Sequence, residues 1–210
     1  MPARSASRAG LALCLLAFLI FFPSCAPSPS VHALSELNHP GPLDEPAPID
    51  IGAVERRVLE LVNAERARRQ LPPLAADTQL QGLARSHSAD MAANRFFDHT
   101  NLRGEGPTQR GETRGIACVR SAGDNRMAIG IGENIFSTYL FNAFTARVRD
   151  GVTQRTYDWK TVDSIAQEAV TGWMNSRGHR LNLLSRQYTT IGIGGASDDE
   201  GQLFLTQNFC

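Results

Sequence analysis

Three histidines beyond residue 50 could take part in chemistry, and each has a different sequence environment. His87 falls among apolar residues at helical spacing, and His99 follows a helical stretch in FFDHT. His179 lies in WMNSRGHRLNLL, where a helical pattern gives way to strand-like sequence. Imidazole titrates near neutral pH and is the commonest metal ligand in proteins. We interpret His87 as a core or rim residue. A histidine just past a helix end, such as His179, indicates a side chain directed into a cleft.

The best-known sequence signatures of hydrolases are missing. The chain has no HExxH motif of zinc peptidases and no GxSxG nucleophile elbow. Ser176 precedes His179 by three residues, which would allow a serine–histidine pair. Near a helix end, however, side chains three residues apart need not meet, so this pair is an alternative interpretation.

The cysteine count bears on whether the folded domain contains a disulfide. Cys14 lies inside an apolar leader and Cys25 at its border, which leaves Cys118 and Cys210 for the folded domain. Two cysteines in an exported domain favour one disulfide, with free thiols or a metal-binding pair as the alternatives.

The first 25 residues read as a signal peptide. Arg4 and Arg8 precede the apolar run from Gly10 to Phe22, which is short for a membrane span. An uncleaved anchor is the alternative. Cys25, three residues after the end of this run, resembles a bacterial lipoprotein processing site, although Pro23 fits poorly, and ordinary cleavage nearby is the other interpretation. We expect an exported protein that contacts a membrane only through a possible lipid anchor.

The rest of the chain divides into a linker and one domain. Residues 26–50 contain six prolines and no apolar period, so we predict a linker there and a single domain over residues 51–210. The 21 basic and 21 acidic residues balance, and the arginines are scattered. A nucleic-acid partner is therefore not expected.

The elements that must position the histidines can be predicted from apolar spacing and caps. Asp50 and Asp77 are expected to cap helices over residues 51–70 and 78–97. A third helix is expected over 161–176, with Ser164 and Gln167 as its capping box and Gly178 as its terminator. Residues 97–115 read as loop and residues 136–160 as a long insertion rich in aromatic side chains.

Two alternating segments, 189–196 and 202–209, predict an antiparallel hairpin at the end of the chain. Early helices followed by late strands indicate an α+β fold in which helices cover a small sheet.

Five segments in order resemble the CAP superfamily, also called SCP domains, and in particular its exported bacterial branch. They are VNAERARRQLPPL, FFDHT, GENI, WMNSRGHRLNLL and YTTIGIGGA with FLTQNF. The resemblance covers about Val54 to Phe209. It implies a three-layer α-β-α sandwich with a small antiparallel sheet and a central cleft lined by two histidines and two acids.

The resemblance assigns three of the four cleft positions. It implies His99 in FFDHT, Glu133 in GENI and His179 in GHR. At the fourth position the family has a glutamate three residues after the helix tryptophan, whereas this chain has Ser176. Glu168 lies on another face of the helix and is a poor substitute.

Three chemistries are open to these residues and Ser176. Two neutral imidazoles with the carboxylate could bind a divalent metal ion, such as zinc or magnesium. Alternatively, Glu133 orients and charges one or both histidines in a hydrogen-bonded polar cluster, which we favour. Ser176 with His179 as base and Glu133 as orienting group is the third possibility. Asn134, Arg180 and Asn182 complete the motifs, and we expect them to support the turns around the site.

For function, we expect a non-enzymatic binding module outside the cytoplasm. The resemblance implies lipid, sterol or fatty-acid binding, or interaction with cell-envelope or host components. The alternative is a metal-dependent hydrolase, a peptidase or esterase, that uses His99, Glu133 and His179.

Overall fold

The computed structural model describes residues 40–121 and 126–210. The predicted signal peptide, Cys25 and most of the predicted linker therefore lie outside the described residues. The helices are α2 (Ile51–Ala67), α3 (Thr78–Asn94), α4 (Pro107–Glu112), α5 (Val162–Asn175) and α6 (Arg177–Leu183). No described helix has the length and apolar content required to cross a bilayer.

The strands form one main sheet and two small ribbons. They are β1 (Ala75–Ala76), β2 (Val119–Ser121), β3 (Met127–Ile129), β4 (Gly132–Tyr139), β5 (Phe141–Arg149), β6 (Val152–Trp159), β7 (Thr190–Ser197) and β8 (Gln202–Phe209). The main sheet has the order β1-β7-β8-β4 and is antiparallel except for the β1–β7 pair. Strands β2–β3 and β5–β6 are separate two-stranded sheets.

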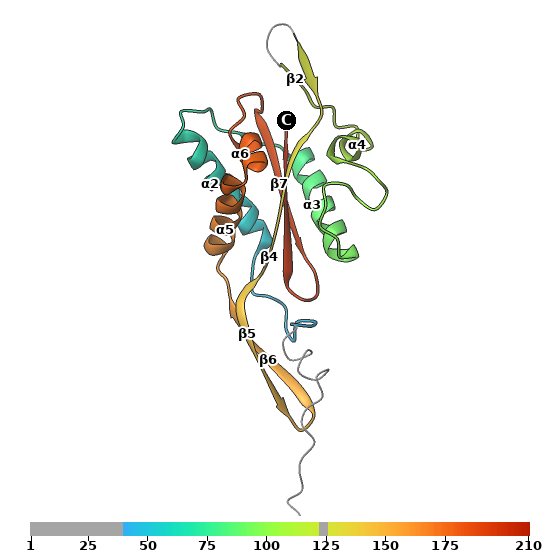
Figure 1. Ribbon diagram of the computed structural model, residues 1–210, viewed down its shortest axis with the longest axis vertical. Coiled ribbons are helices and arrows are strands. Elements are labelled where there is room, and N and C mark those ends of the chain that lie inside the picture. The colour runs from blue at the N-terminus through green and yellow to red at the C-terminus, as the bar shows by residue number, and fades with distance from the viewer. Residues whose placement is uncertain (1–39, 122–125) are drawn as a thin grey trace, which may run out of the picture.

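The main sheet lies between two helical layers, which confirms the predicted three-layer sandwich. Helices α2, α5 and α6 cover one face, and α3 and α4 lie on the other (Figure 1). The largest cluster of buried side chains fills the space between the sheet and the α2–α5 layer, where Val54, Val58 and Trp173 are almost fully buried. Burial of such side chains stabilises the fold by roughly 1.5–3 kcal/mol each.

The first two predicted helices begin where their caps indicated. The Asp50 carboxylate accepts from the Ala53 amide, and the Asp77 carboxylate accepts from the amides of Gln79 and Leu80. These bonds satisfy amides that have no partner inside the helix. The predicted second helix is shorter than expected, because Arg95 adopts a left-handed conformation with φ of 53° and ends α3 there.

Helix α3 lies unusually close to β7, because two glycines face it. A Cβ atom on Gly192 would come within 2.1 Å of the Gln81 backbone nitrogen, and one on Gly194 within 2.0 Å of the Arg85 nitrogen. Real Cβ atoms do not approach so closely, so only glycine permits this helix–strand distance. The isoleucines that alternate with them, Ile191 and Ile193, point to the opposite face and pack in the main core.

Three predictions of local structure are wrong. The residues predicted as loop include α4, which Pro107 begins at a position where a missing amide costs nothing. The capping box of α5 is formed by Thr161 and Ser164, three residues earlier than predicted, which lets Val162 pack against the core. Gly178 does not terminate a helix, because α5 ends at Asn175 and a second short helix follows.

The predicted insertion is mostly a β-hairpin. Strands β5 and β6 project away from the sandwich at its lower end (Figure 1). Asp150 and Gly151 at its apex have φ of 53° and 77°, as the two-residue type I′ turn requires. Rings of Phe141, Tyr157 and Trp159 lie 4.8–6.0 Å apart near its base.

The chain reaches the domain beside this hairpin. The Asp44 carboxylate accepts from the Arg155 amide and forms an ion pair with its guanidinium group. Ala47 and Ile49 pack against the main core. The described part of the predicted linker is thus in contact with the domain, and the predicted divisions at residues 25 and 50 stay predictions.

Candidate functional site

The candidate site is organised around Glu133, which lies on β4 with its side chain only 1% exposed. One carboxylate oxygen, Oε1, lies 3.0 Å from Nδ1 of His99. The other, Oε2, forms an ion pair with Arg110. It also accepts from Asn208, directly opposite on β8, at 3.0 Å when the amide is oriented so that its oxygen accepts from the Ala84 amide. Both oxygens of this buried carboxylate therefore have partners.

His99 lies in the loop after α3 and is the partly exposed partner of Glu133. Its side chain is 47% exposed, and its Nδ1 faces Glu133. The hydrogen bond to Glu133 is the main reason that the pKa of His99 is raised above its ordinary value. When Nδ1 carries the proton shared with the carboxylate, Nε2 of the neutral ring can accept a hydrogen bond.

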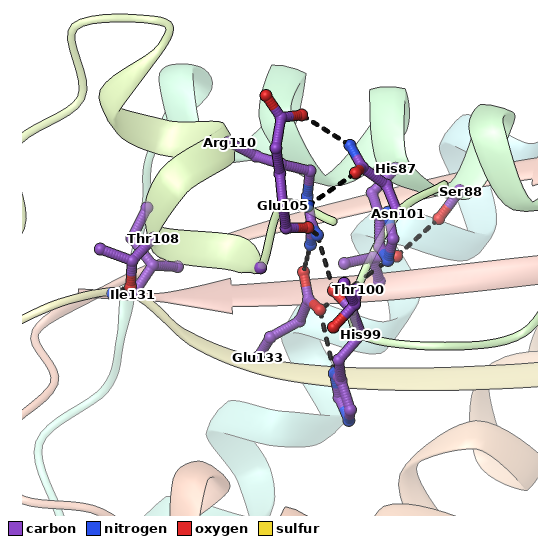
Figure 2. A network of polar contacts seen from close by, with 12 residues as sticks. His87, Ser88, His99, Thr100, Asn101, Glu105, Thr108, Arg110, Ile131 and Glu133 are labelled. Carbon is purple, nitrogen blue, oxygen red and sulfur yellow. Dashed lines mark hydrogen bonds and ion pairs between the residues drawn. The ribbon is translucent and has the colours of Figure 1, made fainter. Parts of the chain in front are cut away.

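Arg110 is a member of the site that the sequence did not reveal. Besides Oε2 of Glu133, its guanidinium group donates to the carbonyl oxygens of His99 (2.6 Å) and Glu105 (2.8 Å). Figure 2 shows Glu133 between Arg110 and His99. Arg110 thus holds both the backbone of His99 and the carboxylate that orients its ring.

His87 lies on the inner side of the same carboxylate. It is 1% exposed, as the apolar stripe predicted, and its Nε2 faces the Asp98 carbonyl oxygen at 2.9 Å and Oε1 of Glu133 at 3.9 Å. Burial lowers the pKa of His87. Two histidines therefore flank one carboxylate with opposite shifts in pKa, because one is buried and the other is half-exposed and hydrogen-bonded to it.

His179 lies within α6 rather than past a helix end and faces His99, and we refer to the space between these two imidazoles as the cleft. Its ring centre is 6.4 Å from that of His99, with the planes inclined by 60°. Burial is the main reason that the pKa of His179 is lowered, and the charge on His99 adds to the effect. The cleft consequently presents two imidazoles of different basicity.

The predicted supporting residues connect β4 to the last two helices. Asn134 donates to the His179 carbonyl oxygen (3.1 Å), and Asn182 donates to the carbonyl oxygen of Glu133 (3.1 Å) and to Oδ1 of Asn134 (2.9 Å). Arg180 donates to the Met174 carbonyl oxygen (2.6 Å), across the break between α5 and α6. These contacts fix the position of α6, and so of His179, relative to Glu133 on β4.

Ser176 takes the extended conformation that separates α5 from α6, with φ of −86° and ψ of 125°. Within residues 40–121 and 126–210, no hydrogen bond joins its hydroxyl group to either imidazole of the cleft. The arrangement thus lacks the serine–histidine contact on which nucleophilic activation depends. Glu168, the other acid considered, pairs with Lys160 away from the cleft.

The fit of the site to a metal ion can be tested on the same contacts. Among the described residues, no three His, Cys, Asp or Glu side chains are grouped so that they could hold an ion. Catalytic zinc sites use three protein ligands, and here both oxygens of Glu133 are already bound by Arg110, Asn208 and His99. The three predicted ligands thus do not fit a three-ligand centre in this arrangement, and metal binding stays a prediction.

The remaining pair of predicted residues, Cys118 and Cys210, lies near the start of β4. They form a disulfide that closes a sequence separation of 92 residues. It joins the end of β8, two residues past Asn208, to the segment that leads from α4 into β2.

Comparison with known proteins identifies the family. The sequence profile of the Cysteine-rich secretory protein family, CAP, matches residues 59–209. The chain belongs to this family. It is 33% identical over 148 residues to the "Uncharacterized protein YkwD" of Bacillus subtilis (strain 168), a match that covers 70% of this chain and 44% of that protein.

Two solved structures share the fold. An extracellular protein containing a SCP domain from Bacillus anthracis str. Ames matches 75% of this chain and 40% of its own, with 29% identity and a TM-score of 0.51. An outer surface protein from Borrelia burgdorferi matches 77% of this chain and 94% of its own, with 17% identity and a TM-score of 0.53, and shows similarity of fold alone. This CAP chain spans less than half the length of the Bacillus subtilis and Bacillus anthracis relatives.

Proposed function

We propose that this CAP protein is an exported, non-enzymatic module that binds an amphiphile with an anionic head group, such as a fatty acid or an acidic phospholipid. The observation that carries the proposal is a groove of about 500 Å³ between α2 and α5. Its volume lies within the range of small-molecule sites. The names of the extracellular and outer-surface relatives support export.

The groove has apolar lining residues, called the floor here, and charged lining residues, called the rim, and its lining also includes Gln167, Thr171 and Asn175. Leu61, Val170 and Met174 contribute apolar side chains from the two helices. The rim has three arginines but a single glutamate, Glu65, which pairs with two of them. A hydrocarbon chain on the floor and a carboxylate or phosphate group at the rim would satisfy both parts.

The groove adjoins the histidine cleft without being part of it. Arg180 lines the groove and directly follows His179 in α6. In the cleft, both carboxylate oxygens of Glu133 have partners, and among the described residues the Ser176 hydroxyl makes no hydrogen bond to an imidazole. This supports binding over the alternative of a metal-dependent hydrolase.

The test is displacement of a fluorescent fatty acid by palmitate, measured with two matched tryptophan variants of α2. Ala64 is exposed and lines the groove, whereas Ala67 is exposed and does not. Ala64→Trp should weaken binding about tenfold or more, and Ala67→Trp by less than about twofold. Failure of the wild-type chain to bind, or equal effects of both variants, would refute the proposal.

A second experiment distinguishes fatty-acid binding in the groove from binding in the cleft. The double variant His99→Gln, His179→Gln should retain the fatty-acid affinity of the wild type, because neither histidine lines the groove. A large loss in this variant would place the ligand in the cleft instead and would contradict the proposed site.

A further inference from the structure

The tip of the β5–β6 hairpin has an unusual composition for a projecting surface. Val148 and Val152 are 59% and 61% exposed, and they flank the Asp150–Gly151 turn. Arg147 and Arg149 are also exposed at this end. Whereas Arg155 pairs with Asp44, these two arginines form no ion pair with any described residue.

The two valines point to opposite faces of the hairpin. Val148 is directly opposite Thr153, and Val152 is directly opposite Arg149. Because directly opposed residues share a face and successive residues alternate, Val148 lies on one face and Val152 on the other with the two arginines. A flat protein partner could cover only one of these faces. A fluid lipid interface surrounds both, which favours a bilayer as the occupant.

The charge of the tip also fits a membrane with acidic lipids. From Arg147 to Val152 the tip carries two arginines and one aspartate, Asp150. Midway along the hairpin, the charge of Asp44 is compensated by its ion pair with Arg155. Asp158 lies near the base, opposite Ala143. Five residues of strand, about 17 Å, separate that position from Val148, which is about twice the Debye length in physiological salt.

The position at which the chain enters the domain is consistent with a hairpin tip that faces a membrane. The described chain begins at Pro40, and Asp44 contacts Arg155 on the hairpin. The 39 preceding residues contain the predicted export leader and the possible anchor at Cys25. A chain held at a membrane through that segment would enter the folded domain next to this hairpin.

We propose that the tip of the β5–β6 hairpin, residues 147–152, inserts shallowly into the headgroup region of a membrane that contains anionic phospholipids. The valines contact the acyl boundary, and the arginines contact phosphate groups while their stems remain in the apolar region. The charged Asp150 at the apex limits the depth of insertion. This surface is distinct from the groove between α2 and α5, so the two proposals can fail independently.

The test is amide hydrogen exchange of the full 210-residue chain with vesicles of phosphatidylcholine, with and without phosphatidylglycerol. The predicted leader is expected to bind lipid by itself, so the readout is local protection of the hairpin tip, not binding of the whole chain. Protection of residues 147–152 should appear with phosphatidylglycerol vesicles and be absent or much weaker with phosphatidylcholine alone.

Matched variants test the chemistry of the contact. Arg147→Gln with Arg149→Gln should raise the lipid concentration for half-maximal protection about tenfold or more, and Val148→Gln with Val152→Gln should also raise it. Exposed controls at the other end of the molecule should change it by less than about twofold: Arg177→Gln with Arg186→Gln, and Val119→Gln.

Three outcomes would overturn the proposal. The chain could bind vesicles while the tip stays unprotected, or the tip could be protected equally without phosphatidylglycerol. Protection that appears without vesicles as the protein concentration rises would instead identify a second copy pairing with the open edges of the hairpin.

Discussion

Glu133 in the cleft and the aromatic rings of the β5–β6 hairpin are both held by several neighbours, but those neighbours come from different distances along the chain. Glu133 is bound from the loop after α3, from α4 and from β8. The rings of Phe141, Tyr157 and Trp159 contact one another within a single ribbon. Damage to the cleft should therefore reach the whole fold, whereas damage to the hairpin should remain local.

The largest expected effect is that of Arg110→Met. The substitution leaves Glu133 buried without its cationic partner, and loss of one partner of a buried pair costs about 3–5 kcal/mol. Urea unfolding of the variant and wild type measures the change in the free energy of unfolding. Arg103→Met is the control, because Arg103 is 70% exposed and pairs with Glu105, and it should cost less than about 1 kcal/mol.

The double variant Arg110→Met, Glu133→Gln sharpens this test. Removing the carboxylate charge as well should restore part of the stability, since the neutral amide needs no cation. Equal losses for Arg110→Met and Arg103→Met would mean that the buried pair does not stabilise the cleft.

The next effect in size is that of Tyr157→Ala in the hairpin. Tyr157 is 8% exposed and packs against Phe141 and Trp159, and each aromatic pair contributes about 0.5–1.5 kcal/mol beyond its buried area. Amide exchange should show lost protection over residues 141–159 with little change in β8. Thr156→Ala, on the opposite face, is the control. Loss of protection throughout the main sheet would contradict local stabilisation of the hairpin.

The smallest expected effect is the change in stability with pH that arises from His99 and His87. Because the pKa of His99 is raised above 6.5, its contribution to stability is present below that value and declines as pH rises through the folded-state pKa. Because the pKa of His87 is lowered, its contribution is present above 6.5 and declines as pH falls toward the folded-state pKa.

Unfolding measured across this range should therefore separate the two histidines. His99→Gln should cost more stability in acid than in base, and His87→Gln the reverse. The hairpin contains no histidine between residues 141 and 159, so its amide protection should show no transition in this range. A parallel pH response of both variants would contradict the assigned environments.

Much of the fold could be predicted because its signals are local. Asp50 and Asp77 cap helices whose apolar stripes repeat within a few residues, and the alternation over Ile191 and Ile193 is visible in the strand itself. The family resemblance supplied the cleft histidines and Glu133, which do lie together. The disulfide pairing needed only the count of cysteines and an exported context.

The features that the sequence did not predict depend mostly on contacts between residues that are distant along the chain. Arg110 is 23 residues from Glu133 in sequence, and an arginine in a glycine-rich stretch carries no mark of a buried partner. Pro107 and Gln109 are local signs of the start of α4. The Asp150–Gly151 pair is a known hairpin signal, so the β5–β6 hairpin does have a local mark in the sequence.

The glycines of β7 have a consequence for how the cleft can vary. The absence of side chains at Gly192 and Gly194 sets the distance between α3 and the sheet. His87 lies on that helix and His99 in the loop that follows it. The distance of each imidazole from Glu133 therefore depends on the two glycines. A relative with alanine at either position would have to lift the whole helix, and its cleft would be wider by the same amount.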